Sequence, residues 1–316
     1  MLSRSSKVSV VGAGSVGASM AYAMLIRESA REVVLYDINE AKVTAEVLDL
    51  AHGTQFTGAS SITGGTDIAL TANSDVIVIT AGAKQNPGQT RLELAGVNFS
   101  ILESMIPKLL EHSPEAIFLL VTNPCDVLAT AALKLTGLPS NRVFSSGTVL
   151  DSSRLRWLLG AKLGVSTDSI HALIVGEHGD SEFALWSQAH IGPVPLSKWI
   201  TDTGSALTRT DLDELAASVK TAAYKVIEGK GATNFAIGLS GARIVEAIVR
   251  DENAILPVSS VLSNYRGVDG IAMSVPTLVN RNGAVRAIDV PMDASEQLLF
   301  EASASAIANS LAQLKL

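Results

Sequence analysis

Hydrophobic and polar residues follow two recurring patterns along the first half of the chain. Short runs of β-branched and aliphatic residues predict strands, and the amphipathic stretches between them predict helices. The predicted strands are residues 7–11, 32–36, 76–80, 116–121 and 143–145, and the predicted helices are residues 16–27, 40–52, 91–111 and 124–135. Pro107 falls inside the third helix and should kink it. This alternation of strands and helices predicts βαβ units and a parallel sheet.

The pattern changes after about Gly147. A helix over 150–163 precedes a strand over 170–175 and hairpin-like segments to about Val194. The remaining predicted elements are helices 210–228, 236–250 and 294–316 and strands 255–262, 270–275 and 284–287. We therefore predict an α/β fold, with a doubly wound parallel sheet in residues 1–147, an α+β substrate domain in residues 148–316, and a cleft between them.

Composition supports this picture and excludes two broad classes of protein. Of the 316 residues, 47% are hydrophobic and only 17% are charged, which is the opposite balance to that of a disordered chain. Aromatic residues make up only 4%, so the hydrophobic residues are mainly aliphatic, as in parallel strands buried on both faces. No apolar run approaches the ~18 residues of a membrane-spanning helix, so we expect no membrane partner.

Charge and cysteine content narrow the possible partners and location. The net charge is −7, and no basic stretch is suited to a nucleic-acid backbone, so we expect no nucleic-acid partner. Cys125 is the single cysteine, so no intrachain disulfide can form. The residues before the strand at Val8 are too few for a secretory signal. We expect a cytoplasmic protein.

A dinucleotide-binding pattern occupies the first strand–helix junction. Gly12, Gly14 and Gly17 form a G-x-G-x-x-G fingerprint between a predicted strand and a predicted helix, where free N–H groups favour a phosphate. Asp37 closes the second strand, 20 residues after Gly17, where a ribose-binding carboxylate belongs. Ile38 follows, and no arginine stands there to hold a 2′-phosphate, so the pattern predicts a Rossmann-type fold that binds NAD rather than NADP.

Three further segments carry unusual polar residues, each with a simpler interpretation. The loop over 85–91 contains Pro87 and Gly88 and is either a mobile lid or a plain connection. Asp151 and Arg154 share one helix face and form either a site or an intrahelical ion pair. His178 lies between a glutamate and a glycine beyond a strand end, where a ligand can reach it. The five histidines, at positions 52, 112, 171, 178 and 190, form no i,i+4 pair, so we predict no metal site.

Together these segments resemble one known family. The glycine fingerprint, Asp37, the 85–91 loop, the 121–124 segment Val-Thr-Asn-Pro, the Asp151-x-x-Arg154 pair and the 176–179 segment Gly-Glu-His-Gly run in order through nearly the whole chain. The combination resembles the L-lactate/malate dehydrogenase family, and most nearly its bacterial NAD-dependent L-lactate dehydrogenases. The resemblance implies reversible hydride transfer between NADH and pyruvate.

The resemblance also implies roles for individual residues. His178 is the expected acid/base, for which an ordinary imidazole pKa of about 6.5 would suit both directions. Asp151 is the expected orienting carboxylate, Arg154 the bidentate clamp on the substrate carboxylate, and Arg91 the lid arginine that polarises the carbonyl. The remaining expected substrate contacts are Gln85, Asn123, Asp126 and Thr233. The expected NAD contacts are Gly12, Gly14, Val16, Gly17, Asp37, Lys42, Gly82, Ala83, Ser104, Val121, Asn123 and Ser146.

Substrate choice depends on one position of the predicted lid. Malate-type members carry an arginine where this chain has Gln85, and Thr233 matches the pocket wall of lactate-type members. A second substrate carboxylate left unpaired beside a neutral Gln85 would cost several kcal/mol. Lys84 is the alternative source of that charge, although neighbouring lid residues should point apart. Malate dehydrogenase activity is therefore the second possibility within the family.

A regulatory site is implied on the same helix. Arg154 and Arg156 are two residues apart, so they point about 200° apart around a helix. Positions that match Arg156 and His171 bind fructose 1,6-bisphosphate across a two-fold axis in bacterial relatives, which implies a homotetramer with this effector. A surface arginine and a packed histidine are the simpler interpretation. A non-catalytic NAD-binding sensor or structural protein is the alternative from a different class, although it would need none of the proton-transfer residues.

Overall fold

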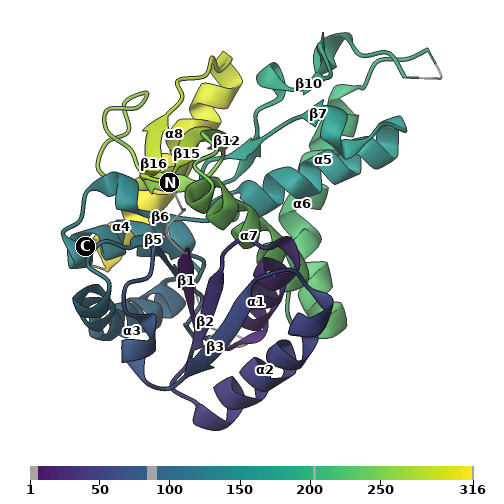
Figure 1. Cartoon of the computed structure of the whole chain (residues 1–316). Coiled ribbons are helices and arrows are strands. Elements are labelled where there is room, and N and C mark those ends of the chain that lie inside the picture. Colours follow the sequence, from purple (N-terminus) through teal and green to yellow (C-terminus); the bar gives the residue numbers. More distant parts are fainter. Residues whose placement is uncertain (1–5, 84–90, 202–203, 315–316) are drawn as a thin grey trace.

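The computed structural model describes residues 6–83, 91–201 and 204–314, and an eight-stranded sheet lies at its centre (Figure 1). The strand order is β14-β13-β6-β5-β4-β1-β2-β3. The six strands of the first half are mutually parallel: β1 (Lys7–Val11), β2 (Glu32–Tyr36), β3 (Ser61–Gly65), β4 (Val76–Ile79), β5 (Ile117–Leu120) and β6 (Val143–Ser145). The predicted doubly wound parallel sheet is confirmed.

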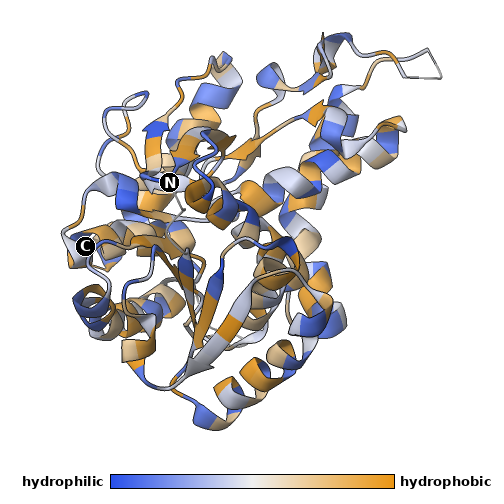
Figure 2. Cartoon of the chain, viewed as in Figure 1, coloured by the Kyte–Doolittle hydropathy of each residue, from blue (hydrophilic) through white to orange (hydrophobic). Residues whose placement is uncertain are grey.

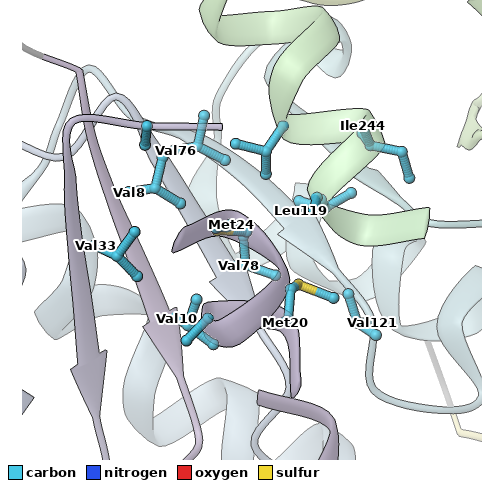
Figure 3. Close-up of a cluster of buried hydrophobic side chains, with 14 of the residues drawn as sticks. Val8, Val10, Met20, Met24, Val33, Val76, Val78, Leu119, Val121 and Ile244 are labelled. Carbon is cyan, nitrogen blue, oxygen red and sulfur yellow. The ribbon is translucent and has the colours of Figure 1, made fainter. Parts of the chain in front are cut away.

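Helices cover both faces of this sheet because its strands alternate between two hydrophobic clusters. Val8, Val10, Val78 and Leu119 face the cluster that also holds Met20 of α1 (Figure 3). Their neighbours face the second cluster: Val11, Ile77, Ile79, Phe118 and Leu120. The helices on the first face are α1 (Ser15–Arg27), α2 (Glu40–Gly53) and α7 (Phe235–Val249), and those on the second are α3 (Arg91–His112) and α4 (Cys125–Thr136). In Figure 2 the central strands are mostly orange, whereas the surrounding helices carry both colours.

Segments beyond residue 147 complete the central sheet. The strands β13 (Ser259–Val261) and β14 (Ala272–Ser274) extend it antiparallel from β6. The helix α7 packs along α1, where Arg27 donates two 2.7 Å hydrogen bonds to the buried carboxylate of Glu246. The two halves therefore share one core, and the boundary at residue 147 stays a prediction.

In the described part of the second half, three more helices and three small sheets complete the fold. The helices are α5 (Val149–Leu163), α6 (Arg209–Lys230) and α8 (Ala294–Gln313). The small sheets are β11-β10-β7 (Val194–Pro195, His190–Ile191, Ile170–His171), β12-β15-β16 (Ala254–Leu256, Thr277–Asn280, Gly283–Ala287) and β8-β9 (Ile174–Val175, Phe183–Ala184). The short 3₁₀ helices are Thr54–Phe56, Ile68–Thr71, Ser140–Arg142, Thr167–Ser169, Trp186–Gln188 and Leu196–Lys198.

Four details of the predicted elements were wrong. The strands β3 and β15 were not predicted, and β3 has the sequence Ser-Ile-Thr-Gly-Gly, with a single strong hydrophobic residue. The predicted strand 255–262 is two strands in different sheets, interrupted at Pro257, which has no N–H for a ladder. The predicted strand 170–175 is likewise two strands, since β7 pairs with β10 and β8 pairs with β9. By contrast, Pro107 lies within α3 as predicted, and the kink expected there stays a prediction.

The order reversal of the sheet predicts where a ligand binds. From β1 the chain builds outward to β2 and β3 on one side, then crosses to β4, β5 and β6 on the other. Ligands of such sheets bind beyond the carboxyl ends of the strands at this switch point. The glycine fingerprint at the end of β1 lies there.

Gly17 supplies a test of this junction. A Cβ at Gly17 would lie 1.8 Å from the carbonyl oxygen of Gly12 and 2.7 Å from the Thr80 hydroxyl oxygen, whereas a Cβ at Gly14 would meet no atom within 4 Å. Gly17→Ala should therefore lower the free energy of unfolding by at least about 1–3 kcal/mol. Gly14→Ala, the matched control, should lower it by at most about 1 kcal/mol, the cost of alanine at the N-cap of α1. Urea denaturation measures both, and equal effects would contradict the packing described.

Candidate active site

The glycine fingerprint and Asp37 meet at the carboxyl ends of β1 and β2. Gly12 adopts a φ of +108°, which favours glycine, and its N–H donates to the carbonyl of Tyr36 at 2.7 Å. The N–H of Ala13 donates to the Asp37 carboxylate at 2.6 Å. The helix α1 then begins at Ser15, and its N-cap residue Gly14 provides no side-chain cap, so the first N–H groups remain available to a phosphate. The open space at Gly14, the uncapped helix and the adjacent carboxylate together fit a dinucleotide.

Asn98 links the loops that follow β4 and β5, and no sequence motif marks it. Its side chain is 1% exposed and lies on α3. The side-chain oxygen accepts from the N–H of Ala83 at 2.7 Å, and the amide nitrogen donates to the carbonyl of Asn123 at 2.8 Å. A single buried amide therefore joins two loops on which we predicted cofactor and substrate contacts. Because Asn98 lies mid-helix without a motif, only the tertiary contact reveals it.

The other predicted cofactor residues occupy varied positions. Val16 lies half-buried in the first turn of α1, and Lys42 is exposed in the first turn of α2. Val121 and Ser146 are buried just beyond β5 and β6, at the same edge of the sheet. Ser104 is exposed on α3 and donates its hydroxyl hydrogen bond to the carbonyl of Ile101 within that helix. All of these roles stay predictions.

Asp151 joins the two groups expected to contact the substrate. One carboxylate oxygen lies 2.6 Å from Nδ1 of His178, and the other accepts from Arg154 at 2.6 Å. Asp151 is 1% exposed, whereas the His178 side chain is 25% exposed. The intrahelical ion pair is thus present and forms part of the same cluster. The buried carboxylate fixes both cationic side chains relative to each other.

Three hydrogen bonds hold the first turn of α5, which carries Asp151, against β8. The Thr148 hydroxyl donates to the carbonyl of Ile174 at 2.6 Å. The Ser152 hydroxyl accepts from the N–H of Ile174 at 2.9 Å and lies 3.3 Å from its carbonyl oxygen. Since β8 leads directly into the loop of His178, these bonds fix the register between Asp151 and the imidazole.

The loop of His178 is also held from α4 and α8. The N–H of His178 donates to the carboxylate of Asp126 on α4 at 2.7 Å. The N–H of Glu177 donates to the hydroxyl of Ser303 on α8 at 2.6 Å. Gly176 has a φ of +94°, and a Cβ there would lie 2.7 Å from the Ser303 hydroxyl oxygen. The backbone of the loop is therefore fixed on both sides of the imidazole.

The electrostatics of the pair differ from the sequence expectation. Burial by itself would lower the pKa of His178, but the charge and hydrogen bond of Asp151 outweigh it and raise the pKa to about 9. Burial raises the pKa of Asp151, yet the His178 imidazolium and Arg154 overcome this effect and leave it below its usual value. The expectation of an ordinary imidazole pKa was wrong, because the charge and hydrogen bond of Asp151 raise the pKa of His178 by more than burial lowers it.

Asp126 lies behind the catalytic loop. It is 1% exposed, and one of its carboxylate oxygens accepts from the backbone of His178. Burial raises its pKa to about 6, although the Ser259 hydroxyl and the His178 imidazolium partly offset this effect. This position is more consistent with a residue that holds the loop of His178 than with a residue that contacts the substrate. We therefore propose a positioning role for Asp126 in place of the expected substrate contact.

Glu182 was not predicted and lies beside the pair. It is 3% exposed, and ligand atoms of Asp151, His178 and Glu182 all lie within 4.8 Å of one another. A cluster of this composition has the spacing of a metal site, although the His178 imidazole and the Asp151 carboxylate already form a hydrogen bond with each other. The absence of a resident metal stays a prediction. No motif marks Glu182, because its importance depends on the turn that folds it back toward His178.

The remaining predicted site residues are described in part. Thr233 is half-buried in the loop between α6 and α7. Gln85 lies outside the described residues, and Arg91 begins α3. Asn123 is exposed beyond β5. No described hydrogen bond links Asn123 or Thr233 to His178.

The predicted effector residues are neighbours. Nε of half-buried Arg156 donates to the carbonyl of Ala172 at 3.0 Å, next to His171, which is exposed on β7. His171 stands opposite His190 of β10 in the sheet register. Among residues 6–83, 91–201 and 204–314, no carboxylate pairs with Arg156. The guanidinium of Arg156 has no carboxylate partner there and lies close to the exposed imidazole of His171. Such a pair of groups can bind an anion.

The charge of Asp126 provides a stability test. Its carboxyl has a higher pKa in the folded chain, about 6, than its ordinary value of 3.8. Above pH 6 the buried Asp126 carboxylate therefore lowers the free energy of unfolding. This loss of stability disappears as the pH falls toward 4, because the carboxyl group is then protonated. Asp126→Asn keeps an acceptor for the His178 N–H and should raise the free energy of unfolding at pH 8 by about 1–3 kcal/mol, with a smaller gain at pH 5.

Urea denaturation at both pH values measures this difference. Asp49→Asn on the exposed face of α2 is the control and should change stability by less than about 0.5 kcal/mol. A large loss of stability in Asp126→Asn at pH 8 would contradict this expectation. It would show that the interactions of the ionised carboxylate stabilise the fold by more than its burial destabilises it.

Comparisons with known proteins agree with this architecture. Residues 6–145 match the lactate/malate dehydrogenase NAD binding domain, and residues 148–315 match the alpha/beta C-terminal domain of the same family. An L-lactate dehydrogenase of Bifidobacterium animalis subsp. lactis is 48% identical, over 97% of this chain and 96% of its own length. One from a Synechococcus species is 45% identical, over 94% of this chain and 96% of its own length.

Solved structures show the same likeness. The minor L-lactate dehydrogenase of Enterococcus mundtii, in its ligands-bound form, superposes with a TM-score of 0.94 at 38% identity, over 98% of each chain. Within the part of this chain that the structure describes, none of the helices has the length and apolarity to cross a membrane. The chain belongs to the lactate/malate dehydrogenase family.

Proposed function

We propose that the chain is an NAD-dependent L-lactate dehydrogenase, which interconverts pyruvate and L-lactate. The single observation that carries the proposal is the Asp151 carboxylate shared between His178 and Arg154. An NAD-binding sensor or structural protein has no use for a histidine whose proton is held by a buried carboxylate next to an arginine. The full-length likeness to curated L-lactate dehydrogenases supports the same conclusion.

The crevice at the carboxyl ends of β1 and β4 is the proposed NAD site. Bound NADH supplies the hydride for pyruvate reduction, and NAD accepts it in the reverse direction. The uncapped N-terminus of α1 would hold the pyrophosphate, and Asp37 would bind the adenosine ribose. The loop at Gly82 and Ala83, fixed by Asn98, would form the wall nearer the substrate.

His178 is the proposed acid/base. With its raised pKa the imidazole carries a proton at neutral pH, so it can donate that proton from Nε2 as the substrate carbonyl becomes an alkoxide. Asp151 holds Nδ1 and stabilises the imidazolium before transfer. In lactate oxidation the neutral imidazole accepts the hydroxyl proton. Reduction should therefore predominate below pH 9 and oxidation should be favoured by alkaline pH.

Arg154 is the proposed clamp for the substrate carboxylate. One of its nitrogens is held by Asp151, which orients the guanidinium and leaves other N–H donors for two carboxylate oxygens. Its side chain is 16% exposed, so this ion pair with substrate would form in a partly dehydrated site. Arg91 and Asn123 are proposed to bind the reacting oxygen, and Arg91 would act once the 85–91 loop closes.

Pyruvate is preferred over oxaloacetate in this proposal. Gln85 is neutral, and Thr233 lines the pocket, so no cation is assigned to a second substrate carboxylate. Lys84 is the remaining source of such a charge, and it supports the malate dehydrogenase alternative. Relatives named L-lactate dehydrogenase, 42–48% identical to this chain, favour the monocarboxylic substrate.

Fructose 1,6-bisphosphate is the proposed effector. Arg156 has no carboxylate partner among the described residues and lies beside exposed His171, where two such pairs related by a two-fold axis would face two phosphates. The effector would favour the state with higher pyruvate affinity. The simpler interpretation, a surface arginine and a packed histidine, is weakened by the exposure of His171.

A homotetramer in the cytoplasm completes the proposal. Large apolar side chains, each 46–68% exposed, lie on α1, α6 and α7: Tyr22, Ile26, Tyr224, Ile227, Phe235 and Leu239. Exposed apolar residues on neighbouring helices mark a surface that another subunit covers. The single cysteine, Cys125, is buried and suits a reducing compartment.

A panel of 2-oxo acids tests the proposed function. NADH oxidation should show kcat/KM for pyruvate at least about 100-fold above that for oxaloacetate, because an unpaired buried carboxylate costs several kcal/mol. Gln85→Arg should reverse this preference. Fructose 1,6-bisphosphate should lower the pyruvate concentration that gives half-maximal rate.

The outcomes of the panel separate the parts of the proposal. No pyruvate-dependent oxidation of NADH would remove the enzymatic function. Equal kcat/KM for the two acids would contradict the pocket argument alone. Pyruvate saturation curves that superimpose with and without the effector, at several pH values, would contradict the regulatory site alone.

A further inference from the structure

Glu182 is a buried carboxyl group that the mechanism above does not use. It follows His178 by four residues, and its N–H donates to the carbonyl of Gly179 at 3.3 Å, which closes a tight turn. The residue is 3% exposed, so its carboxyl group is largely removed from water. Burial disfavours the charged form of a carboxyl group, so the charge state of Glu182 depends on the charges that surround it.

The turn directs Glu182 to the catalytic pair. Its carboxylate, the Asp151 carboxylate and the His178 ring each offer an atom within 4.8 Å of the other two. If all three groups were ionised, two negative charges and one positive charge would share a site largely removed from water. The excess negative charge is costly there, so one carboxyl is expected to keep its proton near neutral pH.

The direction of each pKa agrees with this expectation. Burial, followed by repulsion from Asp151, raises the pKa of Glu182 to about 8, and attraction to His178 opposes the change. Glu182 in turn contributes to the raised pKa of His178. At pH 7 the cluster therefore holds an ionised Asp151, a charged imidazole and a neutral Glu182, and its net charge is zero.

We propose that Glu182 is a positioning residue that acts through His178, because its carboxylate, when ionised, stabilises the imidazolium and widens the pH range in which the histidine can donate a proton. The proposal rests on the proposed function. As the pH rises, Glu182 loses its proton first, and the new negative charge delays the loss of the proton from His178. The catalytic acid is thus preserved into the alkaline range.

Other charged groups near His178 come from several elements. Asp151 and Arg154 lie on α5, Asp126 lies on α4, and Lys220 of α6 donates to the carbonyl of Asp180 at 3.1 Å. Glu177 precedes the histidine in its own loop and accepts a hydrogen bond from Ser181. Replacing Glu182 by glutamine leaves all of these groups unchanged and removes one ionisable charge with little change in shape.

Glu182→Gln should move the pH profiles of the two directions in a characteristic way. Pyruvate reduction requires the imidazolium, so its kcat/KM at pH 10 should fall about threefold to tenfold relative to the unaltered chain, with no change at pH 6. Lactate oxidation requires the neutral imidazole, so its kcat/KM at pH 8 should rise. Steady-state kinetics from pH 6 to 10.5 measure both, together with the Kd for NADH.

Three further variants act as controls. Glu182→Asp retains the charge and should retain the alkaline limb of reduction. Glu301→Gln on α8 changes the net charge equally at an exposed position and should leave both profiles in place. Glu182→Met, apolar and of similar length, replaces the glutamine variant if that variant does not fold, and the same shift is expected.

Superimposable profiles for Glu182→Gln and the unaltered chain would overturn the proposal while leaving the proposed function intact. A fall in both directions at every pH would also overturn it, since that pattern reports a general structural role. An unaltered chain that does not oxidise NADH with pyruvate would instead remove the proposed function.

Discussion

The hydrogen bond between the Asp151 carboxylate and Nδ1 of His178, 2.6 Å long, is the interaction on which the site depends. In water such a pair would contribute little, but Asp151 is almost completely buried, so the attraction outweighs the cost of removing the imidazolium from water. The pair therefore keeps its proton at neutral pH. Arg154, held by the other oxygen of the same carboxylate, is oriented by the same interaction.

Much of the second half of the molecule maintains that geometry. Thr148 and Ser152 fix the start of α5 to β8, and the loop beyond β8 is held by Asp126 and Ser303. Each of these contacts joins segments that are far apart in the chain. Asn98 likewise bridges the loops of Ala83 and Asn123, on which we predict cofactor and substrate contacts. These hydrogen bonds hold the loop of His178 and the first turn of α5 in a fixed arrangement around the imidazole.

Local features were predictable from the sequence, whereas balances of opposing energies were not. The strand of Val8, the turn at Gly12 and the position of Asp37 depend on residues close in the chain, and the structure places them together. The strand β3 was missed because its two glycines and one isoleucine give no hydrophobic signal. The pKa of His178 was misjudged because it depends on the competition between burial and Asp151, which only the tertiary structure defines. Glu182 carries no motif and becomes visible through that same proximity.

The most direct test of this account is the pH dependence of kcat/KM for pyruvate reduction in the unaltered chain and in Asp151→Asn. With Asp151 in place, the rate should stay high until about pH 9 and then fall as His178 loses its proton. In Asp151→Asn the midpoint of that fall should move below pH 7, because the imidazole loses its charged partner while remaining largely buried. A midpoint that is the same in both chains would contradict the claim that the buried ion pair sets the catalytic acid.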